Sequence, residues 1–128
     1  WLSSMKFRVF ITDAQSHDRT VAMTSHVIQL LASALGSTIF EELGENDPGN
    51  HLDHLALSGG ALAGFSRLMS SPVGMWHEIS VQNRNEIQKV LSKLILKMQS
   101  LCMAESATGS EFQSIFEDAA MISKGLQK

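Results

Sequence analysis

Residues 21–39 read VAMTSHVIQLLASALGSTI, and this stretch decides the fold class. Its apolar side chains recur at multiples of three and four residues, as on one face of a helix: Val21, Ile28, Leu31, Leu35 and Ile39. The preceding Thr12-Asp13-Ala14-Gln15 has the form of a capping box. We therefore expect a long helix that begins at about Asp13 and ends or bends near Gly36, followed by a short piece through Leu43.

Further helical segments are expected downstream. A short helix at 51–57 breaks at Gly59-Gly60, and another covers residues 61–69. The longest begins after Pro72 and runs to about residue 104, with an apolar seam of coiled-coil spacing: Ile87, Leu91, Leu94, Met98 and Leu101. A second capping box at 108–111 precedes a helix with one apolar face: Phe112, Ile115, Phe116, Ala119 and Ile122. The predicted fold is all-α, a bundle of five to six helices that dimerises through its long helices.

One short segment does not fit a helix. Residues 6–12, KFRVFIT, alternate apolar and polar side chains with the period of a strand. A single strand is not stable alone, so it either pairs with a copy of itself or belongs to the sheet of another domain. We favour the second interpretation because nothing else in the chain resembles a strand. Residues 1–12 are therefore predicted to be the remnant of a sheet from a missing domain, and residues 13–128 the helical domain.

Composition excludes several classes of protein. The 128 residues are 44% hydrophobic and 18% charged, as in one folded domain. Ten basic against 13 acidic residues give a net charge of −3, which argues against nucleic-acid binding. No apolar run approaches the ~18 residues of a membrane span. The lone Cys102 excludes an internal disulfide and is expected in the core beside the seam. We expect a cytoplasmic protein that binds neither nucleic acid nor membrane.

Two motifs that suggest cofactor or metal binding are weak. Gly59-Gly60 and Gly64 lack the spacing and the preceding strand of a dinucleotide-binding fingerprint, so they are expected to break a helix or let helices approach closely. His51-Leu52-Asp53-His54 offers two histidines and a carboxylate, but no further Cys or His stands at ligand spacing. A solvated helix start is the better interpretation, and no metal site is predicted.

The first long helix carries two histidines and other polar side chains. His17 and His26 are nine residues apart, which places them on opposite faces of a regular helix, so they are not expected to share a site. His26 and Gln29 share a face that Ser33 continues. These three side chains form either a solvent-exposed stripe or the wall of a polar pocket, and the sequence leaves both interpretations open.

Arg67 lies in an apolar stretch whose nearest carboxylates in sequence are Asp53 and Glu78. A guanidinium without a local partner is either exposed or available for an anion, and its shape matches a carboxylate. Trp76 follows nine residues later. From these residues alone, an exposed arginine and a core tryptophan are the simpler interpretation.

The wider context of these residues resembles a known family. Residues 11–22, ITDAQSHDRTVA, and 24–32, TSHVIQLLA, resemble the C-terminal helical domain of prephenate dehydrogenases, where a His-Asp pair is followed by a Ser-His-Leu-Pro-His-like segment. Residues 67–72, RLMSSP, with 75–79, MWHEI, and Asn83 resemble a second landmark of that family. The chain differs in having Gln29 where the family has its second histidine.

The resemblance implies the substrate-binding and dimerisation domain of a NAD(P)-dependent prephenate or arogenate dehydrogenase, an enzyme of tyrosine biosynthesis. NAD or NADP and the catalytic histidine would belong to a separate dinucleotide-binding domain, and residues 1–12 would be the remnant of its last strand. This chain is therefore expected to bind no cofactor, to hold no catalytic residue and to be inactive alone. Arg67 would bind a substrate carboxylate and Trp76 would wall the pocket, with His26 and Gln29 as further substrate contacts. The expected assembly is a homodimer. The alternative is a non-catalytic helical dimerisation module.

Overall fold

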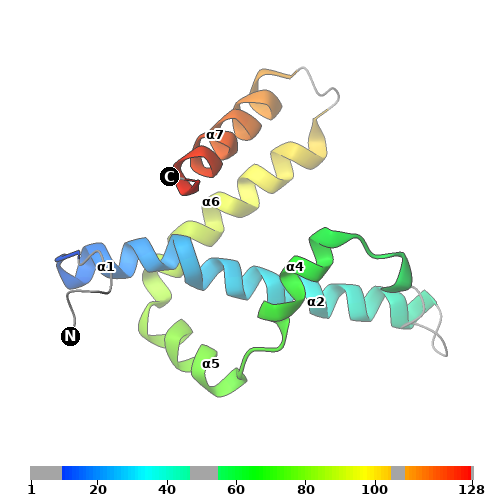
Figure 1. Cartoon of the computed structure of the whole chain (residues 1–128), viewed down its shortest axis with the longest axis horizontal. Helices are drawn as coiled ribbons and strands as arrows, with labels where there is room; N and C mark the ends of the chain where they lie inside the picture. Colours follow the sequence, from blue (N-terminus) through cyan, green and yellow to red (C-terminus); the bar gives the residue numbers. More distant parts are fainter. Residues whose placement is uncertain (1–9, 47–54, 105–108, 128) are drawn as a thin grey trace. The chain divides into compact units, whose positions relative to one another are not determined.

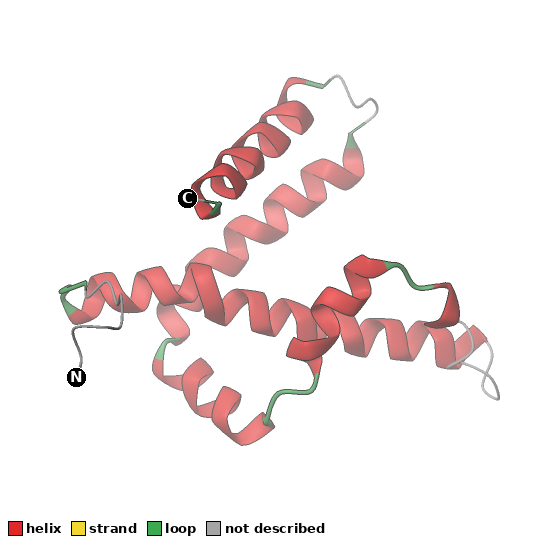
Figure 2. Ribbon diagram, in the orientation of Figure 1, coloured by secondary structure: helices red, strands yellow, loops and turns green. Residues whose placement is uncertain are grey.

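The computed structural model describes residues 10–46, 55–104 and 109–127. Within them every regular element is helical (Figures 1 and 2). The elements are α1 (Ala14–Val21), η2 (Ala22–His26), α2 (Val27–Asn46), η3 (Leu55–Leu57), α4 (Gly60–Met69), α5 (Val73–Gln82), α6 (Arg84–Met103) and α7 (Ser110–Leu126). The all-α prediction is thus confirmed for the described chain, which divides into two compact units, Trp1–Ile87 and Gln88–Lys128.

The first helix begins one residue later than the predicted capping box. Asp13 is the N-cap, and its carboxylate accepts hydrogen bonds from Ser16 N at 2.9 Å and from Ser16 Oγ at 2.7 Å. The assignment of Thr12 as the cap was therefore wrong. A carboxylate at this position satisfies a free N–H and faces the positive end of the helix dipole. The bond from the Ser16 side chain, with that from its backbone, holds the pKa of Asp13 below its usual value.

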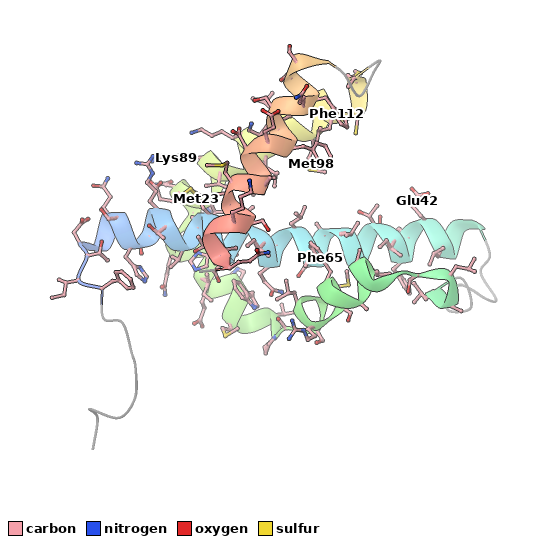
Figure 3. The ribbon with its side chains drawn as sticks, turned by 45° about the horizontal axis from the view of Figure 1, so that its top comes forward. Met23, Glu42, Phe65, Lys89, Met98 and Phe112 are labelled. Carbon is pink, nitrogen blue, oxygen red and sulfur yellow. The ribbon has the colours of Figure 1, made fainter. Side chains whose placement is uncertain are left out.

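Helices α1, η2 and α2 follow one another without a gap and run through Gly36, so the predicted end or bend there was wrong. The reason is a close approach by α4, which lies across α2 (Figure 1). A Cβ atom at Gly36 would lie 3.1 Å from Met69 Sδ of α4. The glycine therefore serves helix packing rather than helix termination. In Figure 3, Phe65 lies on the α4 side of α2, whereas Glu42 projects from the other side.

A buried amide joins α2 to the end of α4. Gln29 is only 4% exposed. Its Nε2 donates to Leu68 O at 2.6 Å and to Ser33 Oγ at 3.3 Å, and its Oε1 accepts from Ser71 Oγ at 3.3 Å. Because Leu68 O is an acceptor only, the amide orientation is chemically fixed. Gln29 therefore acts as a polar cross-link in the first unit.

The predicted single helix after Pro72 is in fact two, α5 and α6, separated at Asn83. Asn83 is the C-cap of α5, with φ −105° and ψ 25°, and is 8% exposed. Its side chain bonds to the first helix instead of facing solvent. Asparagine is a poor residue for a helix interior, which favours a break at this position. The break leaves the Asn83 side chain free to bond to the first helix.

The second unit consists of most of α6 and of α7, which folds back beside it (Figure 1). Phe112 and Phe116 stack with ring centroids 5.0 Å apart. The predicted apolar faces are helical, as expected, but much of their surface is open: Met98 is 47% exposed and Ile122 is 68% exposed. Cys102 is also exposed, so its placement in the core was wrong, since it lies one helix position beyond the seam residue Leu101.

Several predictions fall wholly or partly outside the described residues. The predicted strand covers 6–12, of which only 10–12 are described, and these have no regular secondary structure. Of the predicted helix at 51–57, the described part, Leu55–Leu57, is a 3₁₀ turn. The N-cap of helix α7 is Gly109, which has no side chain to form a capping hydrogen bond. The predicted cap, Thr108, lies outside the described residues.

One helix is long and apolar enough to cross a membrane by composition alone. It covers Ala14–Gly44, with a mean hydropathy of 1.2 over its most apolar 18-residue window. Only 17% of that window is buried within the chain. The same helix carries the buried amide of Gln29 and the half-buried ring of His26. Much of its apolar surface therefore lies open in the single chain.

Replacing Gln29 should destabilise the first unit. Gln29→Leu removes three hydrogen bonds while nearly preserving volume, and we expect it to lower the free energy of unfolding by about 1–3 kcal/mol. Urea unfolding at an unchanged m-value measures this. The control Ser33→Ala removes only the 3.3 Å bond to an exposed serine and should change stability by less than about 0.5 kcal/mol. Equal losses in the two variants would contradict the cross-link.

Candidate functional site

A turn of π-helix rearranges the polar residues of the first helix. In η2 the hydrogen bond from Val27 N reaches Ala22 O, five residues back. This adds one residue to the turn, so the angle between His17 and His26 falls from about 180° to roughly 80°. The prediction that the two histidines lie on opposite faces was therefore wrong. His26 instead lies within electrostatic reach of both His17 and Asp18.

Asn83 connects this part of the helix to the α5–α6 junction. Its Nδ2 lies 2.8 Å from Asp18 O and 3.2 Å from His26 Nδ1. The adjacent His17 Nδ1 lies 3.0 Å from Asp18 Oδ1, with both side chains more than half exposed. The buried amide thus brings together two polar stretches of the first helix and the end of α5.

Trp76 of α5 completes the cluster. Its ring meets that of His26 edge to face, with centroids 6.1 Å apart and an interplanar angle of 78°. The indole Nε1 is buried and has no hydrogen-bond partner within the described chain. Buried indole N–H groups ordinarily have an acceptor. We name His26, Trp76 and Asn83 the histidine cluster.

The surroundings of His26 favour its neutral form. Burial lowers its pKa from the ordinary value of 6.5, the nearby Asp18 carboxylate opposes that shift, and His17 adds to it. Burial is the largest of the three effects. His26 is therefore an uncharged imidazole near neutral pH, suited to hydrogen bonding rather than to pairing with an anion.

Two of the four predicted site residues, His26 and Trp76, are in contact, whereas Gln29 is engaged with α4 one helical turn further on. Arg67 stands in the last turn of α4 with an exposed side chain. No ion pair of Arg67 is found within the described residues, which leave out Asp53. The arginine precedes Leu68, the partner of Gln29, so its backbone is fixed while its guanidinium is open to solvent.

Sequence reasoning did not assign a site role to Asn83. The signal was the run Gln82-Asn83-Arg84-Asn85, where two asparagines stand inside what was taken for one uninterrupted helix. Because asparagine disfavours helix interiors, such a pair indicates either a break or a side chain with another task. Asn83 does both.

The glycines at 59, 60 and 64 lie at the start of α4 and within it. Gly59 is the extended N-cap of α4, and no glycine of the described chain has a positive φ. A Cβ atom at Gly59, Gly60 or Gly64 would meet nothing within 4 Å, so packing within the described chain does not require a glycine at these positions. The described ranges contain no group of three potential metal ligands, and the 51–54 histidine pair lies outside them.

The lowered pKa of His26 predicts a pH dependence of stability. The unfolded chain binds more protons below about pH 6.5, so the contribution of His26 is present above that pH and is lost as the pH falls. Urea unfolding at about pH 7.5 and about pH 5.5 should show that His26→Gln loses less stability on acidification than the wild type. His77→Gln, which changes an exposed histidine of α5, is the control. An unchanged pH dependence in His26→Gln would contradict the assignment.

A comparison with protein families identifies the domain. The family model described as "Prephenate dehydrogenase, dimerization domain" matches residues 13–117, which include α1 to α6, the histidine cluster and part of α7. No solved structure matches the chain. The family match covers most of the sequence and agrees with the resemblance seen in its two landmark segments. The chain belongs to the prephenate dehydrogenase dimerization-domain family.

Proposed function

We propose that this chain is the substrate-binding and dimerisation half of a NAD(P)-dependent prephenate or arogenate dehydrogenase. For prephenate, the reaction is oxidative decarboxylation to 4-hydroxyphenylpyruvate, in which a hydride passes to the nicotinamide and carbon dioxide leaves. The single observation that carries this proposal is the family match over residues 13–117. The polar histidine cluster supports it, because His26 and the indole N–H of Trp76 are hydrogen-bonding groups of the kind that substrate oxygens need.

The proposed substrate contacts divide into two groups. Arg67 would pair with a carboxylate of the substrate, since its exposed guanidinium is available and matches that group in shape. Trp76 and His26 would line the pocket and donate hydrogen bonds to substrate oxygens. Gln29 is occupied by three bonds within the chain, so we assign it the task of holding α4 in place.

The cofactor would be bound by a separate domain. The resemblance to the family supports a nicotinamide cofactor on that other domain rather than on this chain. The nicotinamide, when bound by its domain, would accept the hydride. This chain would orient the ring and carboxylates of the substrate, and alignment of two reactants is itself a large source of rate enhancement.

The second proposed task is formation of a homodimer. Helices α6 and α7 expose large apolar side chains on the seam and the apolar face (Met98, Phe116 and Ile122) and beside them (Ile95, Leu96 and Met121). The apolar helix Ala14–Gly44 is mostly uncovered in the single chain. We propose that a second copy in the cytoplasm, rather than a membrane, covers these surfaces, consistent with the family's description as a dimerization domain.

Association should weaken when charge enters the seam. Met98 is half exposed, so Met98→Glu should leave the fold intact but raise the dimer dissociation constant by roughly 10–100-fold, equivalent to about 1.4–2.8 kcal/mol. Analytical ultracentrifugation over a concentration series measures the change. Lys97→Glu, at the neighbouring exposed position off the seam, is the matched control. A monomeric wild type at high micromolar concentration would refute the dimer.

Substrate binding should depend on Arg67. In the complete enzyme, Arg67→Ala should weaken prephenate binding by roughly 30-fold or more, the cost of losing a charge-assisted carboxylate pair of about 2–5 kcal/mol. Steady-state kinetics should show the loss mainly in KM. Lys124→Ala removes one positive charge from α7 and serves as the control. An unchanged KM with a lowered turnover would exclude the carboxylate role of Arg67.

A further inference from the structure

The orientation of the Asn83 amide is fixed by chemistry rather than by choice. The atom of Asn83 that lies 2.8 Å from Asp18 O must be the NH₂ nitrogen, because a backbone carbonyl can only accept a hydrogen bond. The opposite orientation would place two oxygen atoms against each other in a buried site, since Asn83 is 8% exposed. Nδ2 is thus the atom that faces both partners.

The same nitrogen lies 3.2 Å from His26 Nδ1. An amide NH₂ group has two hydrogens, so it can donate one to Asp18 O and the other to the histidine. His26 Nδ1 must then carry a lone pair. In a neutral imidazole only one ring nitrogen holds a hydrogen, so the hydrogen of His26 resides on Nε2.

We propose that Asn83 is a positioning residue that holds neutral His26 as its Nε2–H tautomer, so that His26 presents a hydrogen-bond donor to the ligand. The edge-to-face contact with Trp76 restrains the ring plane of His26, and Asn83 determines which nitrogen is free to donate. Protonation of Nδ1 would break the bond with Asn83, and burial of the ring acts in the same direction as that bond. The charged or titratable groups that act on His26 are Asp18 and His17.

The tautomer specifies the chemistry of the group that His26 recognises. Nε2–H can donate but cannot accept, and the unpartnered indole N–H of Trp76 has the same property. Two neutral donors on rings that meet edge to face favour a ligand that brings an acceptor oxygen, such as a keto or carboxylate oxygen. This assignment of the ligand group rests on the proposed function, whereas the tautomer itself does not.

Nuclear magnetic resonance of the ligand-free chain tests the tautomer directly. Long-range ¹H–¹⁵N correlation spectra of the ¹⁵N-histidine-labelled full chain distinguish the two neutral forms, and loss of a signal in His26→Gln assigns it. We expect a single Nε2–H form for His26 at a pH above its pKa. An Nδ1–H form, or an average of both forms like that of an exposed histidine, would overturn the proposal.

Two variants separate positioning from general structural support. Asn83→Asp replaces the donor with a carboxylate, which should reverse the tautomer to Nδ1–H, an outcome that mere loosening would not produce. Asn83→Leu should give the averaged spectrum. Gln29→Leu removes the other buried amide of the first unit and should leave the His26 spectrum unchanged. Retention of the wild-type tautomer in both Asn83 variants would overturn the role of Asn83.

Addition of prephenate to the same sample keeps this inference distinct from the proposed function. A correct tautomer with no response to prephenate at any concentration would count against the substrate assignment and leave the role of Asn83 standing. A response to prephenate in a chain whose His26 is Nδ1–H would do the reverse. The expected result is the Nε2–H form together with a shift of the His26 signal.

Discussion

The two hydrogen atoms on the amide nitrogen of Asn83 connect the first helix to the junction between α5 and α6. One bonds to the carbonyl of Asp18 and the other faces His26, and both contacts lie in a largely buried site. A buried amide without partners would cost about 1–3 kcal/mol, so its environment must satisfy it. Two local irregularities make this possible. The π-turn Ala22–His26 rotates the histidine toward the junction, and the break between α5 and α6 lets the asparagine face the first helix. π-turns often occur at functional sites. This one positions His26 in the cluster that also contains Trp76, whose buried indole N–H has no partner in the described chain.

The apolar side chains obey a different constraint. The apolar residues that are nearly fully buried are few in the described chain: Ala22, Val27, Ala32 and Ile87. Meanwhile large side chains on α6 and α7 remain open, Leu96 at 63% and Met121 at 68%. Exposed apolar area of this kind is a common mark of an interaction surface. The polar cross-links of Gln29 and Asn83 therefore order the first unit, whereas the hydrophobic surface is left for contact with another molecule. A dimerization domain needs this division, because the same residues cannot both complete a core and bind a partner.

The sequence predicted the helical class, the segment 61–69 and the amphipathic helix that follows residue 109, because apolar periodicity is a local property. The family resemblance was confirmed by the comparison, and two residues singled out through it, His26 and Trp76, lie in contact. Their role toward a substrate stays a prediction. Sequence reasoning failed where tertiary contacts override local preference. Gly36 was taken as a helix end, but Met69 packs against it. The π-turn has no sequence signature of its own, so the angle between His17 and His26 could not be predicted by counting residues. Asn83 was treated as part of a continuous helix because its partners lie far away in sequence.

In the proposed function, the histidine cluster is where this domain meets the substrate. The most direct measurement is an NMR titration of the chain with prephenate that follows the indole N–H of Trp76, because this donor is buried and has no partner in the described chain. We expect the Trp76 signal to shift saturably, as when a donor acquires an acceptor. If prephenate binds and the Trp76 signal stays in place, the substrate lies elsewhere and the proposed role of the cluster is contradicted.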